Sequence, residues 1–276
     1  MTSVAPVQVV TLSDGGVVAY ARHGAPGGRL VVMHHGLVGN TEMDAGWAAL
    51  AAKAGVELLV LARPGYGASP PRAMSSVADW PACVEAVLER LEVPERFDVL
   101  GLSAGAPYAY ALAAGLRARV ERVAIVSGVP RVCEPDVLAH YAEVNQAAYA
   151  GFLSADDETL RSQFEGWLQV LASTVEDEDG LMAAALRDIQ HHGYAGPARE
   201  ARLQARPWGF RMEDVHQQVE LWHARGDDQV PFEAVKTSIR QLPRARLNIQ
   251  EHPSHMPSEE TARAVFRFLS SPVARS

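Results

Sequence analysis

The hydrophobic positions of this chain fall into short runs with a recognisable rhythm. Two β-like runs, Val7–Leu12 and Val17–Ala21, flank the turn sequence Ser13-Asp14-Gly15-Gly16, and this pattern predicts a hairpin. Beyond it, short apolar runs alternate with longer segments of helical period, which indicates parallel strands buried on both faces. We expect strands at 29–35, 56–62, 97–102 and 120–127, and helices at 42–54, 76–92 and 104–117.

The alternation stops after Pro130 and resumes some 80 residues later. Between these points the apolar positions keep helical spacing, with helices expected at 135–153, 158–172 and 181–191. The last part of the chain predicts a strand at 219–224, a helix at 232–242, a strand at 246–250 and a helix at 258–270. The sequence therefore predicts an α/β fold with a mostly parallel, doubly wound sheet and an N-terminal antiparallel hairpin. We expect residues 1–130 and 213–276 to form the core, and residues 131–212 to form a helical cap or lid inserted into it.

Composition and charge narrow the class of protein. Of the 276 residues, 48% are hydrophobic and 21% are charged, which is ordinary for a soluble globular protein. The formal net charge of −8 repels nucleic-acid backbones, so we expect no nucleic-acid partner. The two cysteines, Cys83 and Cys133, imply no disulfide framework.

Two further patterns concern the cellular location. No apolar run approaches the ~18 residues that a membrane span requires. The first residues, MTSVAPVQVV, contain no basic segment followed by an apolar stretch, so we expect no secretion signal. These observations favour a cytoplasmic protein, and they leave open whether it is a monomer or a homodimer.

One serine stands in an unusual setting, Gly101-Leu102-Ser103-Ala104-Gly105, between an expected strand and an expected helix. A sharp strand-to-helix turn strains the backbone, and the flanking glycines keep side chains away where strand and helix nearly touch. A serine at such a turn is lifted clear of the sheet, next to the N–H groups of a helix N-terminus. This setting favours Ser103 as a nucleophile.

A serine nucleophile needs a base, and the base needs an acid. The stretch LWHARGDDQVP (221–231) supplies acids directly after an expected strand. The stretch QEHPSHMPSEE (250–260) supplies histidines between an expected strand and the final helix. The chain order serine, acid, histidine is the order expected on a sheet of this kind.

These stretches together carry a resemblance to a known family. The chain resembles the α/β-hydrolase superfamily through His35-Gly36, Arg63-Pro64-Gly65-Tyr66-Gly67-Ala68-Ser69 and the turn around Ser103. The tract His223-Ala224-Arg225-Gly226-Asp227, followed by Val230-Pro231, resembles the acid turn of that family, and Ser254-His255-Met256 resembles its histidine loop. The sequence departs from the usual pattern where Ser254 precedes the histidine, where Ala62 precedes Arg63 and where Ala224 follows His223.

The resemblance implies a role for each matching residue. Ser103 would be the nucleophile, His255 the base and Asp227 the orienting acid, with Asp228 and His252 as the alternatives for the last two roles. The backbone N–H groups of Leu37 and Ala104 would form the oxyanion hole.

The resemblance also implies an esterase-like activity. We expect a serine hydrolase that acts on a small to medium, mostly apolar carboxylic ester, lactone or thioester through an acyl-enzyme, with no metal and no cofactor. A ligand-binding protein without activity, and acyl transfer, cyclisation or carbon–carbon cleavage in the same site, stay open as alternatives. Aromatic and apolar residues of the cap, Phe152, Trp167 and Met182 among them, are expected to bind the substrate.

Overall fold

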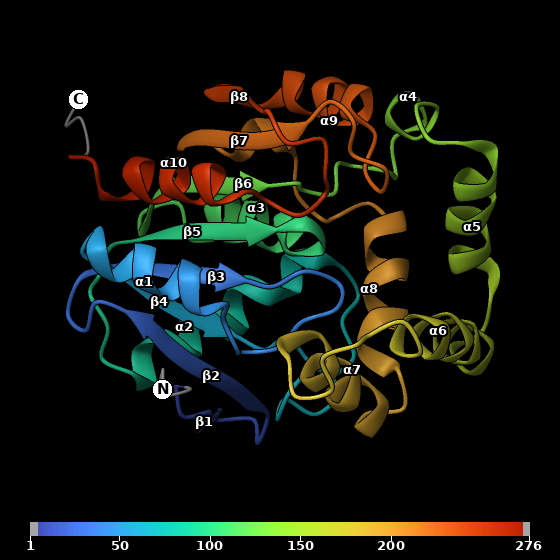
Figure 1. Ribbon diagram of the computed structural model, residues 1–276, viewed down its shortest axis with the longest axis horizontal. Helices are drawn as coiled ribbons and strands as arrows, with labels where there is room; N and C mark the ends of the chain where they lie inside the picture. Colours follow the sequence, from blue (N-terminus) through green and yellow to red (C-terminus); the bar gives the residue numbers. More distant parts are fainter. Residues whose placement is uncertain (1–4, 273–276) are drawn as a thin grey trace.

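A computed structural model describes residues 5–272, so the ends of the expected core, 1–4 and 273–276, lie outside the described residues. The described residues form an eight-stranded sheet in the order β1-β2-β4-β3-β5-β6-β7-β8 (Figure 1). Only the pairs β1–β2 and β2–β4 are antiparallel among these strands. The strands are β1 (Gln8–Thr11), β2 (Val17–Gly24), β3 (Arg29–His34), β4 (Val56–Leu61), β5 (Phe97–Leu102), β6 (Val120–Val126), β7 (Gln218–Ala224) and β8 (Ala245–Gln250).

Helices cover both faces of this sheet (Figure 1). One face carries α1 (Ala45–Lys53) and α10 (Glu259–Ser270), and the other carries α2 (Trp80–Arg90), α3 (Ala106–Gly115) and α9 (Phe232–Ser238). Successive strand residues point to opposite faces, so Val31 and Leu58 share a cluster with Phe266 of α10, whereas Val32 and Leu59 share one with α2 and α3. The fold class predicted from the sequence is confirmed.

A run of helices connects β6 to β7, beyond the carboxyl ends of the parallel strands (Figure 1). They are α4 (Pro135–Leu138), α5 (Glu143–Ser154), α6 (Asp157–Ala172), α7 (Leu181–His191) and α8 (Ala195–Ala205). The expectation of one helix over 135–153 was wrong. Helix α4 ends at Leu138, and the backbone becomes extended at Ala142, directly after Tyr141, of which only 4% is exposed in the core.

Helix α8 was not predicted at all. Its buried positions include Glu200 and Gln204, and these polar residues interrupt the apolar pattern by which a buried helix is recognised. The helix packs against α5, α6 and α7 and thereby holds the inserted helices together. In residues 5–272, no helix is both long enough and apolar enough to cross a membrane.

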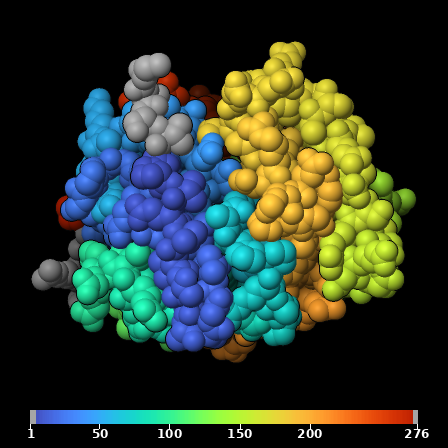
Figure 2. All heavy atoms as spheres, turned by 90° about the horizontal axis from the view of Figure 1, so that it is seen from below, coloured from blue at the N-terminus to red at the C-terminus, as the bar shows by residue number. Residues whose placement is uncertain are grey.

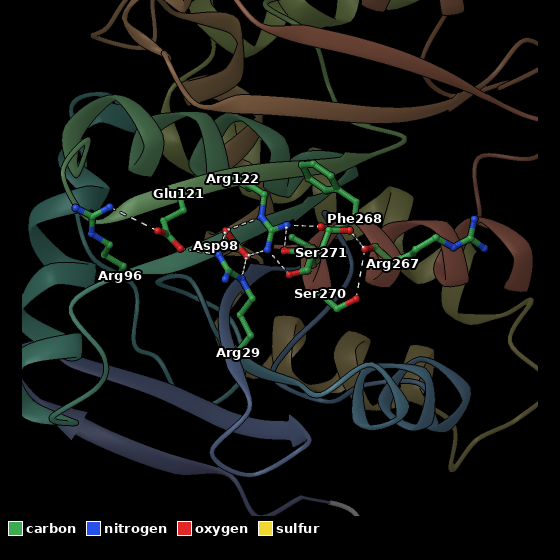
Figure 3. A network of polar contacts seen from close by, with 10 residues as sticks. Arg29, Arg96, Asp98, Glu121, Arg122, Arg267, Phe268, Ser270 and Ser271 are labelled. Atoms are coloured by element: carbon green, nitrogen blue, oxygen red, sulfur yellow. Dashed lines mark hydrogen bonds and ion pairs between the residues drawn. The ribbon is translucent and has the colours of Figure 1, made fainter. Parts of the chain in front are cut away.

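A buried cluster of charged side chains lies at the opposite end of the sheet, where the parallel strands begin (Figure 3). Asp98 of β5, with no exposed side-chain surface, lies between Arg29 of β3 and Arg122 of β6, and its contact with Arg122 is 2.9 Å. The Arg122 guanidinium also donates to the carbonyls of Leu269 and Ser271, at the end of α10. These hydrogen bonds satisfy the last carbonyls of the helix and fix α10 to the sheet.

Candidate active site

Ser103 lies on a sharp turn between β5 and α3. Its φ is +48°, a conformation that is costly for a residue with a side chain. The two flanking glycines make the turn feasible. A Cβ on Gly105 would lie 2.3 Å from the His34 carbonyl oxygen, and one on Gly101 would lie 2.9 Å from Cα of Ala106. The spacing seen in the sequence therefore reflects close contact of helix, strand and neighbouring backbone.

The structure brings Ser103, His255 and Asp227 together from three separate loops. The Nε2 atom of His255 lies 2.9 Å from the Ser103 hydroxyl, and its Nδ1 lies 2.9 and 3.1 Å from the two carboxylate oxygens of Asp227. With Nδ1–H donating to the carboxylate, Nε2 is left to accept the hydroxyl proton. The alternative residues Asp228 and His252 are exposed. The hydrogen-bond chain thus runs through Asp227 and His255.

The loop after β7 fixes the carboxylate of Asp227. The backbone N–H groups of Gln229 and Val230 each donate to its Oδ1 at 2.9 Å. Burial disfavours the ionised carboxyl, but the hydrogen bonds from His255 and from these N–H groups outweigh burial and lower the pKa of Asp227 below its usual value. The group is therefore ionised at neutral pH, as an acceptor for the imidazole must be.

A second histidine, His223, packs against the same carboxylate. Its Nε2–H donates to the Val230 carbonyl at 2.8 Å and lies 3.5 Å from Oδ2 of Asp227. Burial lowers the pKa of His223, so the ring is neutral and adds no charge beside Asp227. His223 therefore supports the loop that carries Asp227.

Ser127, at the end of β6, was missed in the sequence. Its hydroxyl donates to the backbone carbonyl of His255 at 2.6 Å and accepts from the Gln250 side chain at 3.1 Å. Its own φ is +47°, so a second strained residue stands at the same edge of the sheet. The signal available was a serine-glycine pair directly after an apolar run. Ser127 fixes the loop that carries the imidazole.

The loop His35-Gly36-Leu37 lies directly beside Ser103. A Cβ built on Gly36 would be 3.7 Å from Cβ of Ser103. The Arg63 guanidinium donates to the carbonyls of His35 and Gly36, at 2.7 and 3.0 Å. These bonds fix the peptide planes that precede Leu37, whose N–H was predicted as an oxyanion donor.

Arg63 itself is held by Glu200 of helix α8. The two side chains form a doubly hydrogen-bonded ion pair, and neither has any exposed surface. The next turn of the same helix places Gln204 3.4 Å from the carbonyl of Ala104, in the turn of Ser103. Helix α8 therefore contacts the turn of Ser103 directly through Gln204, and it holds the loop before Leu37 indirectly through Arg63.

The three predicted substrate-binding residues lie in different environments. Phe152 packs against the apolar cluster of α6, α7 and α8, which Leu37 also joins. Trp167 contacts the ring of Phe164 but keeps 50% of its surface exposed, and Met182 keeps 40%. Phe152 is thus the one of the three that shares a cluster with the loop beside Ser103.

The adjacent histidines His34, at the end of β3, and His35, directly after it, are neutral. Burial, followed by the charge of Arg63, holds the pKa values of His34 and His35 well below their usual range. His35 donates through Nδ1 to the Gly36 carbonyl at 2.7 Å, which makes it part of the loop's own support. Among residues 5–272, no group of three or more histidine, cysteine or carboxylate side chains is placed to hold a metal ion.

Comparisons with known proteins identify the family and the fold of this chain. The pimeloyl-[acyl-carrier protein] methyl ester esterase of Nitrosomonas europaea is 28% identical over 199 residues, which are 70% of this chain and 76% of that protein. An esterase from Exiguobacterium antarcticum superposes with a TM-score of 0.73 at 16% identity, covering 96% of this chain and 99% of its own. An enol-lactonase from Burkholderia xenovorans gives 0.64 at 18% identity, with 95% and 97% covered. A family model described as "alpha/beta hydrolase fold" matches residues 29–260. This chain therefore belongs to the alpha/beta hydrolase fold family and is an enzyme with hydrolase-type activity.

Proposed function

We propose that the protein is a serine hydrolase that cleaves a carboxylic ester through an acyl-enzyme. The observation that carries this proposal is the continuous hydrogen-bond chain from the Ser103 hydroxyl through His255 to Asp227. The relative from Nitrosomonas europaea, named as a methyl ester esterase, supports the choice of an ester.

Each group in the chain has a chemical task. The Ser103 oxygen attacks the ester carbonyl carbon while its proton passes to Nε2 of His255. The imidazolium then gives this proton to the leaving alcohol as the carbonyl–oxygen bond breaks. A water molecule repeats both steps, which releases the acid and restores the serine. The ionised Asp227 holds the imidazole in the required tautomer and stabilises its charged form.

The negative charge that develops on the carbonyl oxygen needs donors. We assign these to the backbone N–H groups of Leu37 and Ala104, on the two segments that meet at Ser103. A donor of this kind typically lowers the barrier by about 3–4 kcal/mol. The hydrogen bonds from Arg63 to the carbonyls of His35 and Gly36 keep the first segment rigid, so little reorganisation is needed during reaction.

The substrate is proposed to be small or medium in size and mostly apolar. Residues 131–212 act as the cap, because α6, α7 and α8 place apolar side chains in one cluster with Leu37 and Phe152. Lactones are the second class to test, since an enol-lactonase shares the fold over 95% of this chain. Hydrolysis of an open-chain ester releases a separate alcohol. Hydrolysis of a lactone leaves the alcohol attached to the acid in one product.

The proposal is tested with p-nitrophenyl butyrate and a fluorophosphonate probe. The Ser103→Ala variant should lose kcat on the order of 10⁶-fold and should not be labelled. Ser254→Ala is the matched control, because this serine stands next to His255 in sequence, and within residues 5–272 its hydroxyl bonds only to the Met256 N–H. Labelling of Ser103→Ala at the wild-type rate, or a folded wild type that never reacts, would exclude the proposal.

A further inference from the structure

A cavity of about 300 Å³ lies away from the proposed active site. It is bounded by the segment after β4 and by helices α6 and α8, and none of Ser103, Asp227 and His255 lines it. Figure 2 shows this side of the molecule, where the turquoise segment that follows β4 lies beside the gold helices of the insertion. Five arginines line the cavity: Arg72, Arg161, Arg199, Arg202 and Arg206.

Two of these arginines have a carboxylate partner of their own. Arg72 pairs with Asp14 at 2.6 Å, and Arg202 pairs with Asp157 at the start of α6. Arg161 and Arg206 are exposed and form no ion pair with any carboxylate in residues 5–272. Asp157 also lines the cavity, but the arginines outnumber it, so the cavity has a net positive charge although the chain as a whole carries −8.

Arg199 is the most unusual member of the set. Only 13% of its side chain is exposed, and its Nε and one terminal nitrogen are buried without a hydrogen-bond partner in the described part of the chain. Its nearest carboxylate, Glu200 at 3.7 Å, is already bonded twice to Arg63. Buried donors without a partner destabilise a fold, and those of a charged group do so most.

Helix α8 explains how these charges come together. Arg199, Arg202 and Arg206 follow at intervals of three and four residues, so they lie on one side of the helix. Glu200 and Gln204 lie on another side and contact Arg63 and the turn of Ser103. Arg202 and Arg206 thus lie on another side of the helix than Glu200 and Gln204, whereas the Arg199 guanidinium lies within 3.7 Å of Glu200.

We propose that this cavity is a binding site for a small molecule that carries a diphosphate group. Guanidinium groups bond phosphate oxygens in pairs, and a diphosphate offers enough oxygens for several arginines at once, which a single carboxylate does not. A cavity of this size lies at the small end of ligand-binding pockets. The ligand would neutralise Arg161 and Arg206, the two exposed arginines of the cavity that have no carboxylate partner in residues 5–272.

The site is tested by isothermal titration with inorganic pyrophosphate, and with orthophosphate and citrate as comparisons. Pyrophosphate should bind most tightly, and its affinity should fall as sodium chloride is raised. The Arg161→Gln/Arg206→Gln double variant should bind at least about 10-fold more weakly, a loss equivalent to ~1.4 kcal/mol. Both residues are exposed, so the variant should fold, which circular dichroism checks.

The matched control is Arg90→Gln, an exposed arginine at the end of α2 that does not line the cavity. It should bind pyrophosphate like the wild type, and so should Ser103→Ala, because the titration requires no turnover. The site is therefore tested independently of ester hydrolysis. Absence of pyrophosphate binding, equal binding by the double variant, or tighter binding of citrate would each overturn the proposal.

Discussion

The buried pair of Arg63 and Glu200 offers the sharpest test of how the inserted helices support the proposed active site. Glu200→Gln removes one charge and keeps the shape of the side chain. The guanidinium, with no exposed surface, would then be a buried cation without a counter-ion. Breaking a fully buried ion pair in this way costs about 3–5 kcal/mol. A domain is typically stable by about 5–15 kcal/mol, so the variant should unfold much more readily.

Urea unfolding followed by circular dichroism measures this loss. The urea concentration at the midpoint should fall, and the dependence of the unfolding free energy on urea concentration should stay the same. That result shows that the stability has changed and that the surface exposed on unfolding has not. Glu158→Gln, an exposed acid at the start of α6, is the matched control and should stay within about 0.5 kcal/mol of the wild type. A loss below about 1 kcal/mol in Glu200→Gln would refute the reasoning, because a burial penalty of that kind cannot be so small.

A double variant separates stability from positioning. Arg63→Met with Glu200→Leu removes both charges, so the urea midpoint should recover much of the loss seen in Glu200→Gln. The carbonyls of His35 and Gly36 would still lack the two hydrogen bonds that Arg63 donates. We therefore expect kcat of the double variant for p-nitrophenyl butyrate to be about tenfold below that of the wild type, which corresponds to ~1.4 kcal/mol of transition-state stabilisation. We expect KM to change little.

Three further predictions concern other buried groups. Asp98→Asn should cost about 3–5 kcal/mol in urea unfolding, because it leaves Arg122 buried without its partner, and a cost near zero would contradict this. His34 is neutral when folded because its pKa is held well below 6.5, whereas the unfolded chain takes up a proton near 6.5. Stability should therefore fall as pH drops below 6.5, by about 1.4 kcal/mol per pH unit from this residue; His34→Met should reduce that slope, and exposed His252→Gln should not. Asp227→Asn should lower kcat on the order of 10⁴-fold, since an amide favours the wrong imidazole tautomer, and stopped-flow assays with p-nitrophenyl butyrate measure the loss.

The sequence by itself determined those features that depend on residues close together along the chain. Apolar runs predicted the parallel strands, because a strand buried on both faces must be apolar throughout. The Gly-x-Ser-x-Gly spacing predicted the turn at Ser103, because a Cβ at Gly101 or Gly105 would collide with the backbone. The acid and histidine loops were predicted to meet Ser103, because parallel strands end at one edge of the sheet. In the structure, His255 lies 2.9 Å from the Ser103 hydroxyl and 2.9 Å from a carboxylate oxygen of Asp227.

Only the tertiary structure decided which distant polar groups meet. Arg63 and Glu200 are 137 residues apart in sequence, and no local pattern marks an acid on α8 as the partner of a buried guanidinium. The same holds for Ser127, which reaches the His255 carbonyl across 128 residues, and for the arginines gathered around one cavity. Apolar burial follows a period along the chain, which the sequence displays. Pairing of buried charges follows from which elements pack together in space, and that is known only once the chain has folded.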